Sequence, residues 1–263
     1  MRGSRFGPRT LAETEPPPAD VAASERYGPL VHRSVHHGAL LLILGAVEFI
    51  VGMAITQIGY GPTFDWGSSY SLSHNYISDL GATQCGWFHT GALGSGSSYA
   101  CSPWHLVFNV SIIVLGLLLV LAVALLRTAF PARRSRTIGL ALLALAGLGS
   151  IGVGLFPENV NISAHSLSAL VAFLCSGLAL VVLGFAMFRD TRWDGFRAYS
   201  IISGLVTIVA LVLFVAKVYV GLGVGGMERL IVAPVLLWSI VVGVHLARIP
   251  TFAPSKLPKS TAP

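Results

Sequence analysis

The hydrophobic pattern of the chain alternates between long apolar stretches and shorter polar connections. Each stretch is close to the roughly 20 residues of helix that cross a hydrocarbon core. In lipid such a stretch must be helical, because no water is present to satisfy open backbone groups. We therefore predict an all-α, polytopic membrane protein that forms a bundle of six transmembrane helices. The predicted spans cover residues 38–59, 104–127, 137–156, 164–188, 198–219 and 230–248.

The composition supports the same class. Apolar residues make up 54% of the chain and charged residues 11%, and the mean hydropathy is +0.75. Charged residues are roughly a quarter of a typical soluble domain, so the predicted partner of this chain is the lipid bilayer. The pI near 9.5 does not indicate nucleic-acid binding, because the basic residues are scattered over the connections without interleaved aromatic residues.

The positions of Lys and Arg predict the orientation in the membrane. Of the 17 Lys and Arg residues, only Lys217 and Arg229 lie near one set of span ends, and all others lie near the opposite set. Short connections rich in Lys and Arg stay in the cytoplasm, so both termini are predicted to be cytoplasmic in a multi-pass protein of the cell membrane. Residues 1–29 and 250–263 are predicted to be flexible tails around a membrane domain of residues 30–249.

The first outer connection, residues 60–102, contains two of the three cysteines, Cys85 and Cys101. On the oxidising side of a membrane, two cysteines in one connection most simply form a disulfide. Closing a loop of this size would contribute on the order of 3 kcal/mol to the free energy of unfolding.

Polar and ionisable side chains gather in this connection and at the outer span ends. Neighbouring helices lie about 8–10 Å apart, so a bundle would bring these ends within about 10–15 Å of one another. We therefore predict an outward-facing polar pocket. Its predicted members are Asn75, Ser78, Asp79, Asn109, Glu158, His165, Glu228 and Arg229.

Three kinds of chemistry fit these residues. A divalent metal that activates water could be held by carboxylates and imidazoles; the candidate ligands are Asp79, Glu158, His74 and His165. His165 could instead form a metal-free acid and base pair with either carboxylate. Alternatively, Arg229 and Lys217 could hold an anionic headgroup. A purely structural alternative is that Ser78 or Asp79 caps a short helix that ends at Gly81.

Glu48 lies near the middle of the first predicted span, where an ionised side chain is costly. Gly45 and Gly52 lie on the same helical face, so this face is predicted to turn toward other helices. Glu48 could serve as a proton or cation site, or it could make an interhelical hydrogen bond to a group such as Ser239.

Several of these positions together resemble a prokaryotic integral-membrane family known as domain of unknown function 998. The most specific part is the run Asn75 to Gly81, NYISDLG; the others are Phe108, Asn109, Phe156, Pro157, Glu158, His165, Gly225, Glu228 and Arg229. The resemblance spans residues 36–248 and implies a six-helix membrane protein without specifying a reaction. A looser similarity to six- and seven-span lipid hydrolases is an analogy only, because the characteristic helix with paired histidines is missing.

Three functions follow as hypotheses. The first is a membrane protein whose outer pocket binds or processes a lipid headgroup or another small polar ligand. The second is a proton- or cation-coupled transporter that uses Glu48. The third is a non-catalytic envelope or assembly protein.

Overall fold

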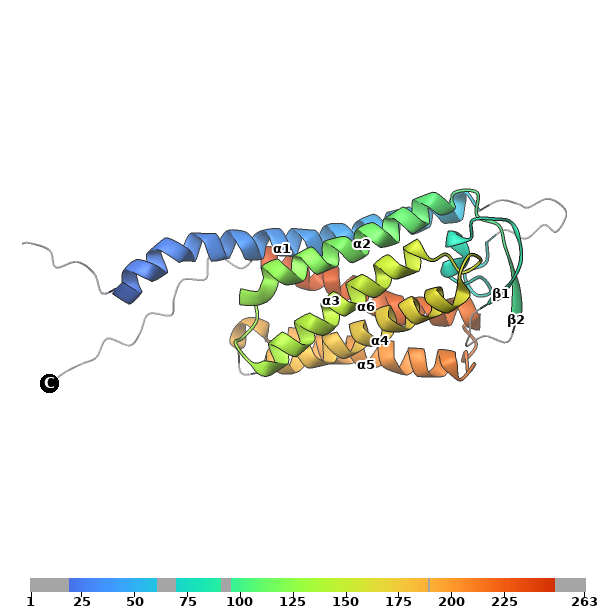
Figure 1. Ribbon diagram of the computed structural model, residues 1–263. Coiled ribbons are helices and arrows are strands. Elements are labelled where there is room, and N and C mark those ends of the chain that lie inside the picture. The colour runs from blue at the N-terminus through green and yellow to red at the C-terminus, as the bar shows by residue number, and fades with distance from the viewer. Residues whose placement is uncertain (1–18, 61–69, 91–95, 189, 249–263) are drawn as a thin grey trace, which may run out of the picture.

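A computed structural model describes residues 19–60, 70–90, 96–188 and 190–248. The described residues form six long helices, two strands and three short 3-10 helices (Figure 1). In chain order the elements are α1 (Ala19–Ile58), η1 (Ser78–Gly81), β1 (Gly86–Thr90), β2 (Gly96–Ala100), α2 (His105–Leu125), η2 (Leu126–Thr128), α3 (Arg134–Leu155), α4 (Ile162–Ala186), η3 (Thr191–Trp193), α5 (Phe196–Val215) and α6 (Gly223–Arg248).

Six helices among the described residues are long and apolar enough to cross a membrane, which confirms the predicted polytopic bundle. Helix α1 begins at Ala19, so the last part of the segment predicted as a tail is helical. The start of α1 and the end of α6 lie at one end of the bundle, and the strands lie at the other (Figure 1). We call these the terminal end and the loop end.

The six helices form a closed ring. Each helix packs mainly against its neighbours in sequence, and α6 packs against α1 to complete the circle. Across the ring, α4 and α6 make only a slight contact. Close packing between neighbouring helices does not by itself bring opposite helices together. The space in the middle of such a ring must therefore be occupied by side chains or remain as a cavity.

Glycine allows α4 and α5 to approach closely near their midpoints. A Cβ atom placed on Gly204 would lie 2.5 Å from the carbonyl oxygen of Gly177 and 2.9 Å from the backbone nitrogen of Val181. Small residues at such contacts are typical of helix pairs in membranes, where close van der Waals packing drives association. The backbones of α4 and α5 are therefore in close van der Waals contact at this level.

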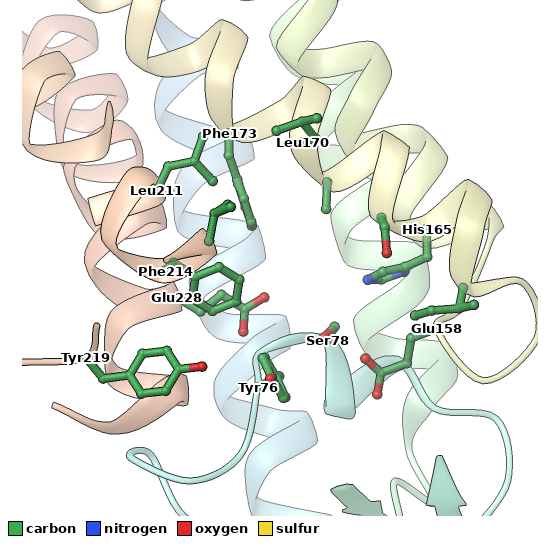
Figure 2. A pocket seen from close by; sticks show the side chains of 14 residues that line it. Tyr76, Ser78, Glu158, His165, Leu170, Phe173, Leu211, Phe214, Tyr219 and Glu228 are labelled. Carbon is green, nitrogen blue, oxygen red and sulfur yellow. The ribbon is translucent and has the colours of Figure 1, made fainter. Parts of the chain in front are cut away.

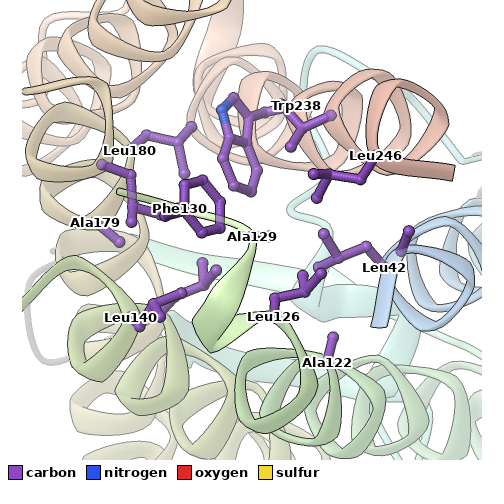
Figure 3. Packing of buried hydrophobic residues seen from close by; sticks show 14 of the residues in the cluster. Leu42, Ala122, Leu126, Ala129, Phe130, Leu140, Ala179, Leu180, Trp238 and Leu246 are labelled. Atoms are coloured by element: carbon purple, nitrogen blue, oxygen red, sulfur yellow. The ribbon is translucent and has the colours of Figure 1, made fainter. Parts of the chain in front are cut away.

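The ring is filled at the terminal end by a core of large apolar side chains (Figure 3). Trp238 of α6 is fully buried, and its indole N–H donates to Ser200 of α5 over 2.8 Å. Phe130 stacks on Trp193 with ring centroids 4.9 Å apart. Leu126, Leu180 and neighbouring side chains complete this core.

A β-hairpin at the loop end differs from the purely helical prediction. Strands β1 and β2 pair in antiparallel fashion, with Gly86 opposite Ala100. The predicted disulfide joins Cys85 to Cys101, which directly flank this pair. A hairpin of two strands is marginal alone, so the covalent link across its open end is a local stabiliser.

The contact between α4 and α5 predicts the effect of a single methyl group. Gly204→Ala improves helix propensity, yet its Cβ would collide with backbone atoms that cannot move aside, and overpacking of this kind typically costs about 1–3 kcal/mol. We expect a lower melting temperature in detergent. Gly226→Ala is the control, because a Cβ there meets only the Leu222 side chain, at 3.0 Å. A Gly204→Ala protein as stable as wild type would contradict the close approach.

Candidate functional site

The connection from Tyr70 to Thr83, which we call the cap loop, folds around the side chain of Asp79. Asp79 is fully buried, and its Oδ2 accepts hydrogen bonds from the Tyr76 backbone N–H and the Asn75 amide, each over 2.9 Å. The Asn75 Oδ1 in turn accepts from the Ser71 backbone N–H over 2.9 Å. Asn75 and Asp79 thus replace the regular backbone pairing that this loop lacks.

Helix α6 holds the cap loop through a buried carboxylate. Glu228 is 6% exposed and accepts hydrogen bonds from the consecutive backbone N–H groups of Ile77 and Ser78. The Gly225 backbone N–H donates to the Ser73 carbonyl over 2.9 Å, and any side chain at Gly225 would collide with the Asn75 carbonyl. The start of α6 therefore approaches the loop backbone directly.

Arg229 fastens the same loop from the other side of the α6 terminus. Its guanidinium donates to the carbonyls of Leu72, Asn75 and Gly225 over 2.8 to 3.1 Å, and to the Tyr70 hydroxyl. The guanidinium also lies 5.3 Å from the Tyr70 ring centroid. These bonds use the planar fork of donors that arginine provides, so Arg229 is engaged with the loop.

Two further segments secure the end of the cap loop. The buried Asn109 of α2 donates to the Gly81 carbonyl over 3.0 Å, and Ser102 donates to the Leu80 carbonyl over 2.7 Å. Asn159 accepts from the Thr83 backbone N–H and donates to the Thr83 hydroxyl, both over 3.0 Å. The cap loop is thus bonded to α2, to the connection between α3 and α4, and to α6.

Glu158 lies in the short connection between α3 and α4 and is 6% exposed. It is hydrogen bonded with Asp79 and with Ser78. Burial raises the pKa of Glu158 well above its ordinary value of 4.5, and the neighbouring Asp79 carboxylate raises it further. Two carboxyl groups in contact favour a shared proton, so Glu158 and Asp79 form a proton-sharing pair.

His165, in the first turn of α4, is 7% exposed and has its tautomer set by one hydrogen bond. Its Nδ1 lies 2.9 Å from the Phe156 carbonyl oxygen. A carbonyl only accepts, so Nδ1 carries the proton and the other ring nitrogen, Nε2, is left as an acceptor. Helix α3 ends just before this carbonyl because Pro157 follows it.

Two cavities meet beneath the cap loop. The outer cavity lies between α4, α5, the start of α6 and the cap loop, and the inner cavity lies inside the ring. Both are lined by Ser78, His165, Ala169, Phe173 and Glu228. Figure 2 shows Glu228 and Phe214 on one side of the outer cavity, His165 and Glu158 on the other, and Ser78 between them.

Apart from Ser78, His165 and Glu228, which it shares with the outer cavity, the inner cavity has a mostly apolar wall. Its three remaining serines donate to carbonyls of their own helices: Ser150 to Ala146, Ser176 to Phe173 and Ser239 to Val235, over 2.9 to 3.1 Å. Leu119 lines this cavity and also belongs to the core of the terminal end. The inner cavity, which we also call the apolar chamber, is therefore bordered by that core at one end and by the cap loop at the other.

The structure divides the predicted pocket residues into two groups. Ser78, Glu158, His165 and Glu228 line a cavity. Asp79 lies behind Glu158 as its hydrogen-bond partner. Three predicted ligand-binding residues line neither cavity and instead bind the loop backbone or its side chains: Asn75, Asn109 and Arg229.

The histidines proposed as metal ligands do not converge. His74 is exposed, and its Nδ1 lies 3.0 Å from the hydroxyls of Ser71 and Ser73. His165, the other proposed histidine, instead has its Nδ1 2.9 Å from the Phe156 carbonyl oxygen. Within the described ranges, no group of three or more His, Cys, Asp or Glu side chains is arranged to hold a metal ion.

Glu48 contacts α2, as its glycine-rich face predicts, but its partner is not Ser239. Its Oε1 accepts a hydrogen bond from Ser111 over 2.5 Å, and a Cβ on Gly52 would meet the same serine. Glu48 is half-buried and lines neither of the two cavities. Neither of these two cavities therefore provides a path to Glu48 for the hypothesised transporter.

Sequence reasoning missed the aromatic residues of the outer cavity. Tyr76, Phe173, Phe214 and Tyr219 line it. Aromatic residues are common at both membrane interfaces, so their presence at span ends gave no distinct signal. Only the packing of α4 and α5 against the cap loop turns them toward one space.

The raised pKa of Glu158 predicts a pH dependence of stability. The fold favours the protonated carboxyl, so its contribution to the free energy of unfolding is complete below the ordinary pKa of 4.5 and is lost as pH rises through the higher folded-state pKa. Glu158→Gln, which resembles the protonated form, should therefore show a flatter decline of melting temperature as pH rises above the ordinary pKa of 4.5. The exposed Asp194→Asn should keep the wild-type slope. Equal slopes for Glu158→Gln and wild type would contradict the buried pair.

Comparisons with known proteins agree with this architecture. Residues 43–245 match the model of the family described as "Protein of unknown function (DUF998)". Comparisons with curated proteins and with solved structures found no match. The family match covers the membrane bundle and includes the cap loop, Glu158, His165 and Glu228, which carry the resemblance seen in the sequence. The chain is a membrane protein that belongs to the DUF998 family.

Proposed function

We propose that this protein binds an amphiphile of the outer leaflet, with the polar head beneath the cap loop and the apolar tail in the inner cavity. One observation carries the proposal: a polar-ended cavity and an apolar chamber share five lining residues under one loop. A head-and-tail molecule satisfies both environments at once, whereas a wholly polar ligand would leave the chamber empty.

The orientation proposed from the charges places the loop end outside the cytoplasm. The described Lys and Arg near the terminal end include Arg127, Arg134, Arg192 and Arg197, whereas Lys217 and Arg229 lie at the loop end. Because Lys and Arg accumulate on the cytoplasmic side, the amphiphile would come from the outer leaflet of the cell membrane, and both termini would be cytoplasmic.

The rim of the outer cavity supports access from the lipid. Leu170 of α4 and Val215 of α5 line this cavity and are 37% and 39% exposed, on a surface that would face acyl chains. The close contact of α4 with α5 at Gly177 and Gly204 lies deeper in the membrane and forms the floor of this opening. A lipid could therefore enter sideways between the outer halves of the two helices.

The volume fits part of a lipid and excludes a whole one. Each cavity has about 80 Å³ of space, against the roughly 10–15 Å³ that one water needs on the same measure. This accommodates a small headgroup and part of one chain, with the remaining chain or chains left in the bilayer. The proposed ligand class is therefore a lipid or another single-headed amphiphile.

The polar end could also add proton-transfer chemistry to binding. His165 presents an acceptor nitrogen, and the raised pKa of Glu158 favours its protonated form. Both line the outer cavity, where a headgroup would lie. Processing of the bound headgroup would use these two residues, with Asp79 as the partner of Glu158.

Filling the shared part of the two cavities tests the proposal. Ala169→Phe would occupy the space where head and tail meet, so the amount of amphiphile bound per protein should fall several-fold. The measurement is native mass spectrometry of protein released from nanodiscs of defined lipid composition. Leu174→Phe, on the exposed side of the same helix, is the matched control and should bind as wild type does.

Two results would contradict this function. The first is a wild-type protein that carries no lipid or other amphiphile. The second is a folded Ala169→Phe protein, with a melting temperature near wild type, that retains the full amount of bound amphiphile.

A further inference from the structure

The wall of the outer cavity formed by α5, α6 and the cap loop combines aromatic rings with a carboxylate. Tyr76 and Phe214 have ring centroids 6.0 Å apart at an interplanar angle of 84°. Phe214 and Tyr219 have centroids 6.4 Å apart at 62°. These three rings and Glu228 all line the cavity (Figure 2).

Rings set at steep angles to one another around a cavity are a known way to hold an organic cation. The face of each ring is electron-rich, and it attracts an ammonium group that lies within about 6 Å of the centroid. The two edge-to-face pairs, with centroids 6.0 and 6.4 Å apart, place three rings side by side along one wall of the cavity, so a cation that lies against this wall would be within this range of more than one ring.

The charges around the cavity favour a cation over an anion. Two carboxyl groups line it, Glu158 and Glu228, and no described Lys or Arg lines either cavity. Arg229, the next residue after Glu228, is bonded to loop carbonyls and Tyr70. Lys217 is exposed on the connection after α5 and lines neither cavity. Arg229 and Lys217, the residues that could have held an anionic headgroup, thus do not line the cavities.

We infer that the outer cavity recognises an organic ammonium group, held by the rings of Tyr76, Phe214 and Tyr219 and by the carboxylate of Glu228. This inference rests on the proposed amphiphile-binding function and specifies its headgroup. The same ammonium chemistry could belong to a lipid headgroup or to a free cation in solution, and the two sources are separable by experiment.

The test compares ligands that share a chain and differ in the head. Calorimetric titration of nanodisc-embedded protein, corrected with empty nanodiscs, would use decyltrimethylammonium, decyl sulfate and decyl maltoside, with tetramethylammonium as the chain-free cation. We expect decyltrimethylammonium to bind at least about tenfold more tightly than the sulfate or the maltoside, given the strength of desolvated cation contacts with aromatic rings.

Matched variants test whether the rings of Tyr76, Phe214 and Tyr219, which we call the aromatic cage, bind the cation. Phe214→Leu and Tyr219→Leu keep an apolar wall but remove a ring, so each should weaken decyltrimethylammonium binding by about tenfold and leave decyl maltoside binding unchanged. Phe185→Leu, on an exposed part of α4, should alter neither. Thermal melts of each variant establish that the fold is intact.

The outcomes separate this inference from the proposed function. Equal binding of the cationic, anionic and neutral decyl compounds would overturn the ammonium site and leave amphiphile binding standing. Tight binding of tetramethylammonium without any decyl compound would support the cage as a site for free cations and overturn the amphiphile. Binding of none of the four would overturn both.

Discussion

The structure depends on one constraint: the inner part of a polar loop, residues 77–82, lies buried at the end of an apolar ring, and each of its buried backbone groups needs a partner. A buried polar group without a hydrogen bond costs roughly 1–3 kcal/mol in proteins. The cap loop has only a short 3-10 helix to satisfy its own groups. Side chains from distant parts of the chain supply the rest, and Glu228, Arg229 and Asn109 bind the loop backbone directly.

This constraint explains why the ionisable residues of the loop end have separate tasks. Arg229 and Asn109 donate hydrogen bonds to carbonyls of the cap loop, and Asp79 accepts a hydrogen bond from a backbone N–H of the same loop. Glu228 accepts backbone N–H groups on one side and borders the cavities on the other. Glu228 therefore contributes both to the position of the cap loop and to the proposed binding site, so a variant there would change the packing of the loop and the charge of the cavity.

Much of the architecture follows from the sequence, because it is governed by simple solvent rules. Apolar length predicts the six spans, and the pairing of Cys85 with Cys101 follows from their place in one connection. The polar residues that would gather were also predictable as a group. Their individual roles were not, since Arg229 could face a headgroup or a carbonyl equally well on charge alone, and only the path of the cap loop decides between them.

The aromatic cavity and the β-hairpin were beyond sequence reasoning for different physical reasons. Tyr76 and Phe214 are far apart in the chain, and their rings meet only because the cap loop descends between α5 and α6. The segment from Gly86 to Ala100 contains several glycines, which are depleted in strands, so its composition gives no clear strand signal; the disulfide flanks the pairing at its open end.

Amide hydrogen exchange of the cap loop tests the central claim most directly. If Glu228 and Asp79 hold the backbone of this loop in a buried site, the amides of Tyr76, Ile77 and Ser78 should exchange about as slowly as those of the adjoining helices. Glu228→Ala should speed exchange at Ile77 and Ser78 in particular. Exchange of these amides at the rate of an open, solvated connection in the wild-type protein would contradict the account.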